Sequence, residues 1–277
     1  MSPTQGVIGE AWELYKRHWQ HLFSIAFIVY AITSLLGLIL VATLTWFGAI
    51  LAAIISLVAY FWVQGALITA VDDIRDGRAD LSVGETFQRV RPRLGSIIVG
   101  GILLALAISI GFLLLIVPGL LALTWWSMVI PVIVLEGRSA GDAFGRSRDL
   151  VRGYAWNVFG IIIITFLILV AFSIVLDLIL TPVADWLQSF ISDVVTGTVA
   201  TPFAIAAWSI LYFRLRDAKE APVAAAAETP LEPSPAPQAP PSSEPPPASE
   251  PPTPPPPSSE PPPASRPPTP PPPDTTP

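Results

Sequence analysis

Residues 113–160, LLLIVPGLLALTWWSMVIPVIVLEGRSAGDAFGRSRDLVRGYAWNVFG, decide the fold. One apolar run turns at the sequence VPG (117–119), and a second apolar run continues to Leu135. The charged segment 136–152 follows, and a third apolar run begins a few residues later. This charged segment is too short for a soluble domain. We therefore expect it to form a small helix that lies on a membrane surface between two membrane-spanning helices.

The composition is that of a membrane protein. Apolar residues make up 52% of the 277 residues, the mean hydropathy is +0.60, and only 13% of residues are charged, whereas soluble domains carry about 25% charge. The absence of cysteine excludes disulfides and thiol chemistry, and two histidines are too few for most histidine-based metal sites. The net charge of −6 comes largely from acids after residue 220, so no basic excess points to nucleic acid. The polar N-terminal stretch lacks a cleavable signal pattern.

Apolar periodicity predicts an all-α integral membrane protein with six transmembrane helices arranged as three hairpins in residues 1–220. The predicted spans are 22–45, 46–71, 96–117, 119–136, 157–180 and 194–213, with a turn near Phe47 and Gly48 and a kink at Pro202. Short cytoplasmic surface helices are predicted at 5–20, 83–91 and 140–152. The second and third of these open with the capping patterns Ser82/Glu85 and Ser139/Asp142, and Pro92 and Gly153 are expected to end them.

Every lysine and arginine falls on one side of this topology, and the three opposite turns contain none. The bases are Lys16 and Arg17; Arg75, Arg78, Arg89, Arg91 and Arg93; Arg138, Arg146, Arg148 and Arg152; Arg214, Arg216, Lys219 and Arg266. The positive-inside rule then predicts a multi-pass protein of the cell membrane with both termini in the cytoplasm. Merging the third and fourth spans into one kinked helix would split the bases between two faces. A re-entrant 118–135 segment would keep them together only if the third span also failed to cross.

A short pattern recurs ahead of each pair of spans: GEAW at 9–12, GETF at 84–87 and GDAF at 141–144, each followed by basic residues. It indicates three units, each made of a surface helix and a transmembrane hairpin. The alternative is that any amphipathic helix that precedes a span shares such residue types. The pattern alone leaves both interpretations open.

Residues 221–277 are rich in Pro, Ser and Glu and hold most of the chain's 32 prolines. The sequence SSEPPPASEPPTPPPP (242–257) recurs as SSEPPPASRPPTPPPP (258–273). Because such a segment cannot bury a core, we expect a disordered tail with polyproline II character. It could be a ligand for the aromatic-lined groove of a protein partner. The lack of a basic anchor beside a clean PxxP favours a spacer.

Three passages resemble the multi-pass membrane domain that is joined to some bacterial glycerophosphodiester phosphodiesterases and also occurs alone. They are GEAWELYKRHWQHLFSI near the start, IVPGLLALTWWSMVIPVIVLEGRSAGDAFGRSRDLVRG in the middle, and AWSILYFRLRDAKE at the end of the sixth span. The resemblance covers about residues 6–220 and not the tail. In that family the catalytic domain is a separate soluble barrel, which this chain lacks. The resemblance therefore implies a membrane domain and no activity or functional residues.

The candidate site residues fall into two groups. Six arginines on the cytoplasmic side are expected to contact anionic lipid or a protein partner: Arg89, Arg91, Arg93, Arg146, Arg148 and Arg152. Each base near an anionic surface contributes about 1 kcal/mol. Gln64 and Asp177 are candidate polar groups within the membrane. Gln64 is expected to make a helix–helix hydrogen bond. Asp177 is either functional, as intramembrane acids often are, or a solvated acid near the outer surface.

Glu136, at the inner end of the fourth span, is expected to pair with Arg138 or another cytoplasmic base. No catalytic group, metal site or cofactor is predicted, because no acid, base and nucleophile are grouped. An intramembrane enzyme therefore ranks last.

Two functions remain. The first is a non-enzymatic membrane scaffold that binds lipid or a partner through its arginines. The alternative is a transporter or permease of a lipid-like or amphipathic substrate. A polar cavity near Gln64 or Asp177 that reaches mid-membrane would favour transport, and a filled core would favour the scaffold.

Overall fold

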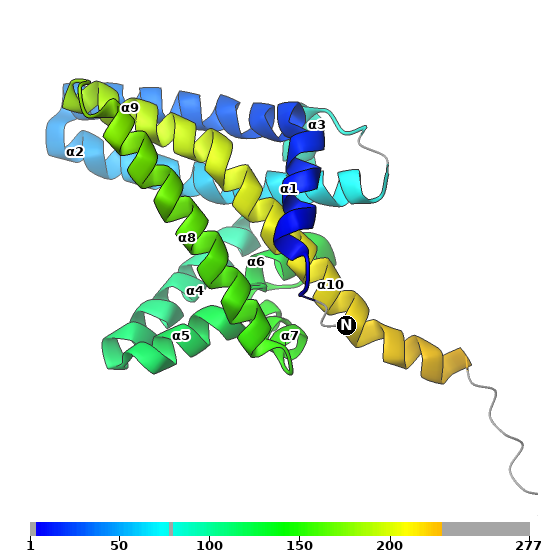
Figure 1. The fold of residues 1–277 in the computed structure, drawn as a ribbon. Coiled ribbons are helices and arrows are strands. Elements are labelled where there is room, and N and C mark those ends of the chain that lie inside the picture. Colours follow the sequence, from blue (N-terminus) through cyan, green and yellow to red (C-terminus); the bar gives the residue numbers. More distant parts are fainter. Residues whose placement is uncertain (1–3, 78–79, 229–277) are drawn as a thin grey trace, which may run out of the picture. The chain divides into compact units, whose positions relative to one another are not determined.

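The computed structural model describes residues 4–77 and 80–228, so the tail predicted to be disordered lies outside the described residues from 229 onward. These ranges are helical, and no strand occurs in them. The α-helices are α1 (Val7–Arg17), α2 (Trp19–Arg75), α3 (Val83–Val90), α4 (Leu94–Leu114), α5 (Ile116–Trp125), α6 (Val129–Pro131), α7 (Ala140–Val151), α8 (Ala155–Leu180), α9 (Asp185–Val195) and α10 (Thr201–Glu228) (Figure 1). Three short segments lie between them: the 3₁₀ turn η1 (Arg91–Arg93) and the π-helical turns η2 (Val132–Glu136) and η3 (Thr196–Ala200).

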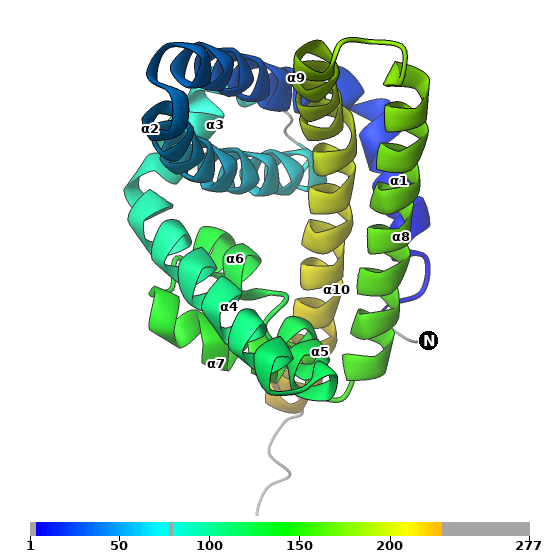
Figure 2. The ribbon, with the colours of Figure 1, turned by 90° about the vertical axis from the view of Figure 1, so that its left-hand side faces the viewer.

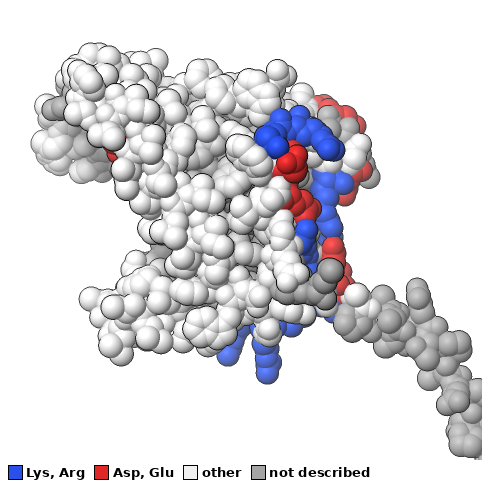
Figure 3. All heavy atoms as spheres, in the orientation of Figure 1, with Lys and Arg blue, Asp and Glu red and all other residues white. Residues whose placement is uncertain are grey.

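Five stretches of the described chain are long and apolar enough to cross a membrane. They are Trp19–Arg75, Val83–Leu114, Ile116–Glu136, Ala155–Leu180 and Trp186–Ala221. Many of their large apolar side chains point outward, such as Leu113, which is 86% exposed. Water-soluble proteins rarely display apolar surface on this scale. Figure 3 shows most of the visible charged side chains at the right and lower edges, with a wide and almost wholly white surface on the left. These features are compatible with a membrane protein.

The longest helix, α2, consists of two arms that run side by side in opposite directions (Figures 1 and 2). The chain reverses at Thr45, the one residue of α2 with non-helical backbone angles (φ 50°, ψ −127°). The reversal comes two residues before the turn predicted near Phe47 and Gly48. Where the arms approach closely, small residues face each other: a Cβ on Gly37 would lie 3.8 Å from the Cβ of Ala52.

The turn was predicted at residues 117–119, but it lies a few residues earlier, at Leu115. Helix α4 ends at Leu114, Leu115 is extended (φ −168°, ψ 157°), and α5 starts at Ile116. Pro118 and Gly119 therefore belong to α5 itself. A proline is tolerated there because the first N–H groups of a helix have no intrahelical partner.

The fourth predicted span, 119–136, is a broken helix. Helix α5 ends at Trp125, a turn covers residues 126–128, and the chain continues through α6 and the π-helical η2. Pro131 contributes to the break because it cannot donate a hydrogen bond to Ser127. The fully buried Ser147 of α7 repairs the gap: its hydroxyl donates to the Trp125 carbonyl (2.8 Å) and accepts from the Met128 N–H (3.1 Å). A surface helix thus completes the backbone of a membrane-length segment.

Helix α10 forms much of the interior. In the stretch Trp186–Ala221, which contains most of α10, 67% of the most apolar 18-residue segment is buried, whereas the corresponding value for Trp19–Arg75 is 11%. The α10 side chains Leu211, Tyr212 and Phe213 are almost fully buried, and α1, α2, α7 and α8 all contact α10 (Figures 1 and 2). The helix extends to Glu228. The run of four alanines at 224–227 favours its last turns, because alanine has the highest helix propensity. The tail boundary at residue 221 stays a prediction.

The predicted caps of the surface helices are confirmed. Ser82 and Glu85 form a complete capping box at α3, the Ser139 hydroxyl accepts from the Asp142 N–H at α7, and Gly153 follows α7 with a positive φ of 92°. The third position of the recurring pattern, occupied by Ala11, Thr86 or Ala143, is 0% exposed in all three helices.

The fourth position of the pattern holds an aromatic ring that packs edge to face in each case, with centroids 5.4 to 6.1 Å apart. The pairs are Trp12 with Phe203, Phe87 with Trp62, and Phe144 with Trp126. The three surface helices therefore share one mode of packing on a longer helical segment. This is what three related units predict, although duplication itself stays a prediction.

Replacing Ser147 with alanine should lower the free energy of unfolding by about 1–3 kcal/mol, because two buried backbone groups lose their partner. Ser24→Ala is the matched control, since the Ser24 hydroxyl bonds only to a carbonyl of its own helix. Unfolding of both purified variants by denaturing detergent in mixed micelles measures the effect. Equal stability of the two variants would show that the break at residues 126–128 does not depend on α7.

Candidate functional site

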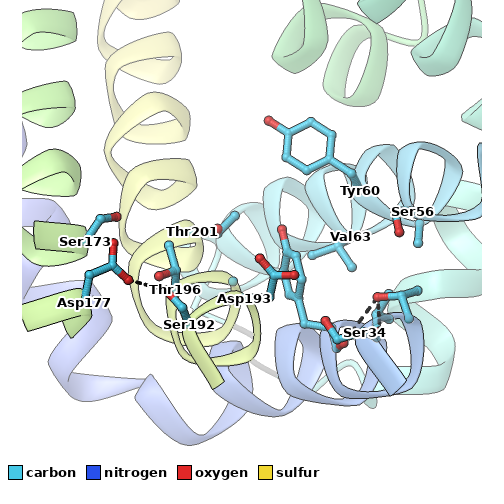
Figure 4. Close-up of a pocket in the computed structure, with 15 residues that line it drawn as sticks. Ser34, Ser56, Tyr60, Val63, Ser173, Asp177, Ser192, Asp193, Thr196 and Thr201 are labelled. Carbon is cyan, nitrogen blue, oxygen red and sulfur yellow. Dashed lines mark hydrogen bonds between the residues drawn. The ribbon is translucent and has the colours of Figure 1, made fainter. Parts of the chain in front are cut away.

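A polar cavity of about 470 Å³ lies among α2, α8, α9, η3 and the start of α10 (Figure 4). Its lining consists mainly of hydroxyl-bearing, acidic and aromatic side chains. The polar and aromatic members are Tyr30, Thr33, Ser34, Ser56, Tyr60, Ser173, Asp177, Ser192, Asp193, Thr196 and Thr201. The structure thus contains a polar cavity at Asp177, one of the two places where a transporter was expected to have one.

Helical spacing explains why these side chains converge. Tyr30 and Ser34 are four residues apart on the first arm of α2, and Ser56 and Tyr60 are four apart on the second arm. Residues four apart share one face of a helix. All four lie near the middle of their arms, which run over residues 19–44 and 46–75. The cavity therefore lies about halfway along the two arms rather than at their ends.

The wall opposite α2 contains the irregular turn η3. Pro202 cannot donate to the carbonyl of Thr198, which favours a departure from the α-helical pattern just before it. The predicted kink at Pro202 thus takes the form of a π-helical turn. Gly197 in this turn lies directly against Tyr30: a Cβ there would be 2.5 Å from the ring. Glycine is therefore required for η3 to approach the first arm of α2. π-Helical turns are frequent at functional sites.

Two carboxylates line the cavity. The Ser192 hydroxyl donates a hydrogen bond to Asp177 Oδ1 at 2.9 Å, which joins α8 to α9. Figure 4 shows Ser173 and Asp177 on one side, Ser56 and Tyr60 of α2 on the other, and Asp193 between them. Among the described lining residues there is no lysine, arginine or histidine. The cavity thus combines two acids with hydroxyl groups and lacks a basic partner.

Gln64 does not join this site. Its neighbour Val63 lines the cavity, while the Gln64 side-chain oxygen is buried without a hydrogen-bond donor in the part of the chain that the structure describes. The helix–helix hydrogen bond expected of Gln64 therefore does not involve this oxygen among the described residues and otherwise stays a prediction. The polar groups beside Asp177 come instead from α2, α9 and η3.

The six candidate arginines divide into two groups. Arg93, Arg146 and Arg148 make contacts within the protein. Arg93 donates to the Val134 carbonyl, Arg146 pairs with Glu136 and Glu220, and the Arg148 guanidinium lies 4.9 Å from the centre of the Trp125 ring. Arg89, Arg91 and Arg152 are exposed, and no ion pair among the described residues involves them. These last three side chains are available for a lipid headgroup or a partner.

Glu136 is the centre of a charged cluster at the same side of the protein. It accepts from Arg138 Nε (2.6 Å), from Arg146 Nε (2.9 Å) and from the Tyr212 hydroxyl (2.9 Å), and its side chain is only 15% exposed. The predicted pairing of Glu136 with Arg138 or another base is confirmed. Burial alone would lower the pKa of Arg146, but its hydrogen bonds to Glu136 and Glu220 outweigh burial and raise it. The cluster joins η2, α7 and α10.

Sequence reasoning found Asp177 and missed most of the cavity. Asp193 was assigned to a short outer segment, although α9 folds it back toward α2. The signal in the sequence was the recurrence of polar residues four apart within apolar runs, as in Tyr30/Ser34, Ser56/Tyr60 and Ser173/Asp177. A single hydroxyl group is common in a transmembrane helix. Two polar residues on the same helix face are more informative, because they indicate a polar surface.

Comparison of the chain with protein-family models, with curated proteins and with solved structures gives no match. No group of three or more potential metal ligands occurs in the described ranges. The function is therefore argued from the geometry of the site.

Replacing Glu136 with glutamine should lower the free energy of unfolding by about 2 kcal/mol, because three donors lose a charged, largely buried acceptor. Glu13→Gln is the matched control, since the exposed Glu13–Lys16 pair is worth less than about 1 kcal/mol. The same detergent unfolding assay measures both changes. A Glu136→Gln variant as stable as the control would show that the cluster contributes nothing to the packing of η2 and α7 against α10.

Proposed function

We propose that this chain is a non-enzymatic, six-span protein of the cell membrane that binds a lipid-like, amphipathic molecule in the polar cavity and transports it. The observation that carries the proposal is the cavity itself, which lies halfway along the arms of α2 and holds two carboxylates. Transporters commonly bind their substrate within the membrane domain, between broken helices. Here the π-helical turn η3 forms part of the wall.

The six spans are the two arms of α2, α4, the broken segment α5–η2, α8, and η3–α10. Three antiparallel pairs result, joined at Thr45, at Leu115 and by the connection that contains α9. The gathering of charge along one side supports an orientation with both termini in the cytoplasm (Figure 3). The membrane domain associated with bacterial glycerophosphodiester phosphodiesterases is the family that we propose for residues 6–220.

A labelled lipid-like amphiphile should move between the leaflets of liposomes that contain the purified full-length protein. Ser34→Phe should reduce this movement severalfold, because the added ring occupies part of the cavity. Thr43→Phe is the matched control, since Thr43 is exposed near the Thr45 reversal and bonds only to its own helix. Detergent unfolding of both variants separates loss of function from loss of folding. Equal rates with and without protein would contradict transport.

The topology predicts which sides of the membrane are labelled, and the chain's lack of cysteine makes the test simple. A membrane-impermeant thiol reagent should modify Thr181→Cys in intact cells and should modify Gly145→Cys only after the membrane is opened. A cysteine fits at both positions: Thr181 is exposed, and a Cβ on Gly145 would have no neighbouring atom within 4 Å. Labelling of both variants in intact cells would overturn the six-span arrangement.

A membrane scaffold is the second candidate, and exposed Arg89, Arg91 and Arg152 favour it. Each base close to an anionic surface contributes about 1 kcal/mol, so this group could hold anionic lipids or a partner while the Pro-rich tail serves as a spacer. The liposome experiment distinguishes the candidates when it is repeated with anionic lipid. Enrichment of anionic lipid around the protein without movement, lost when the three arginines are replaced by glutamine, would favour the scaffold.

A further inference from the structure

The charge of the cavity restricts what can occupy it. Asp177 and Asp193 both line it, and no basic side chain among the described residues lies in its wall to neutralise them. Asp177 accepts its hydrogen bond from a neutral group, the hydroxyl of Ser192. An anion placed here would face two like charges in a region of low dielectric constant, where repulsion is strong. A cation would be attracted by both.

The remaining wall also suits a cation. Tyr30 and Tyr60 contribute aromatic rings from the two arms of α2, and the hydroxyl oxygens of Ser and Thr accept hydrogen bonds from N–H donors. Aromatic rings bind ammonium groups through their faces. Acids, hydroxyls and aromatic rings together match an amine headgroup. They do not match a phosphate, for which the described lining offers no basic side chain.

An apolar groove continues from this polar cavity. The groove has a volume of about 320 Å³ and shares Thr33, Ser34, Ser56 and Asp193 with the cavity. Away from these residues it lies between α2 and α9: Gly37 and Ala53 line it from the two arms of α2, and Trp186 lines it from α9. The arms touch at Gly37 and Ala52, and the small side chains of this contact leave space beside α9 for an alkyl chain.

We propose that the cavity and groove bind a single-tailed amphiphile with a cationic amine headgroup. The head lies beside Asp177 and Asp193, and the tail lies in the groove between α2 and α9. This inference rests on the proposed function, because it names the class of molecule that the same cavity takes. A zwitterionic phospholipid is a poorer fit, since its phosphate would have no basic partner in the lining.

Binding of radiolabelled dodecylamine to the full-length protein in lipid nanodiscs, corrected for binding to empty nanodiscs, tests the proposal. Dodecanol and dodecanoate provide the same tail with a neutral or an anionic head, and propylamine provides the head without a tail. The double variant Asp177→Asn/Asp193→Asn should bind dodecylamine about tenfold more weakly and dodecanol unchanged. Asp149→Asn is the matched control, because Asp149 is exposed on α7 and lies outside the cavity lining.

The possible outcomes distinguish the cationic ligand proposed here from the amphiphile-binding function on which it rests. If the wild-type protein and the Asp149→Asn control prefer dodecylamine and the double variant does not, both the cationic ligand and the amphiphile-binding cavity are supported. Equal binding of amine, alcohol and carboxylate, or a double variant that binds amine normally, overturns the cationic headgroup and leaves an amphiphile-binding protein. Propylamine binding as tight as that of dodecylamine overturns the tail site. Failure of every tailed ligand to bind overturns the proposed function itself. Unchanged dodecanol binding by the double variant also shows that it is folded.

Discussion

A backbone that leaves the α-helical pattern inside a bilayer must find other partners for its N–H and C=O groups, because lipid tails offer none. This constraint organises the protein. The break after α5 is repaired by the buried hydroxyl of Ser147, which accepts from Met128 and donates to Trp125. The same helix α7 also places Arg146 against Glu136 and Phe144 against Trp126. Several contacts of α7 therefore converge on the irregular segment.

The charged groups are divided between two environments. On the charged side, several carboxylates pair with bases, as in the cluster around Glu136 and the pair of Arg75 with Asp217. In the cavity, Asp177 and Asp193 face hydroxyl groups and aromatic rings instead. Paired charges contribute to packing and leave little capacity for a ligand. Unpaired carboxylates in a hollow contribute little to packing, and this contrast is the physical basis for treating the cavity as the functional site.

Local signals in the sequence were sufficient for much of the fold. Apolar runs located the long helices, and the hydroxyl and acid spacing at Ser82 and Ser139 located the caps, because both depend on interactions within a few residues. The break at residues 126–128 was not foreseen, since its stability depends on Ser147, which lies about twenty residues further along the chain. The cavity was largely missed for the same reason. Asp177 was recognised as an acid in an apolar run, but Asp193 becomes its neighbour only when α9 folds back toward α2.

The contacts of α1 have a consequence for how the protein is made. Its ring Trp12 packs on Phe203 of α10, and Arg214 of α10 bonds to Glu10 and to the carbonyl of Gln5. Helix α3 packs on α2, which precedes it, and α7 contacts the preceding α4, α5 and α6 as well as α10. Helix α1 makes most of its contacts with α10 and fewer with α2 and α8. The first helix to leave the ribosome therefore gains most of its packing only after α10 has been synthesised.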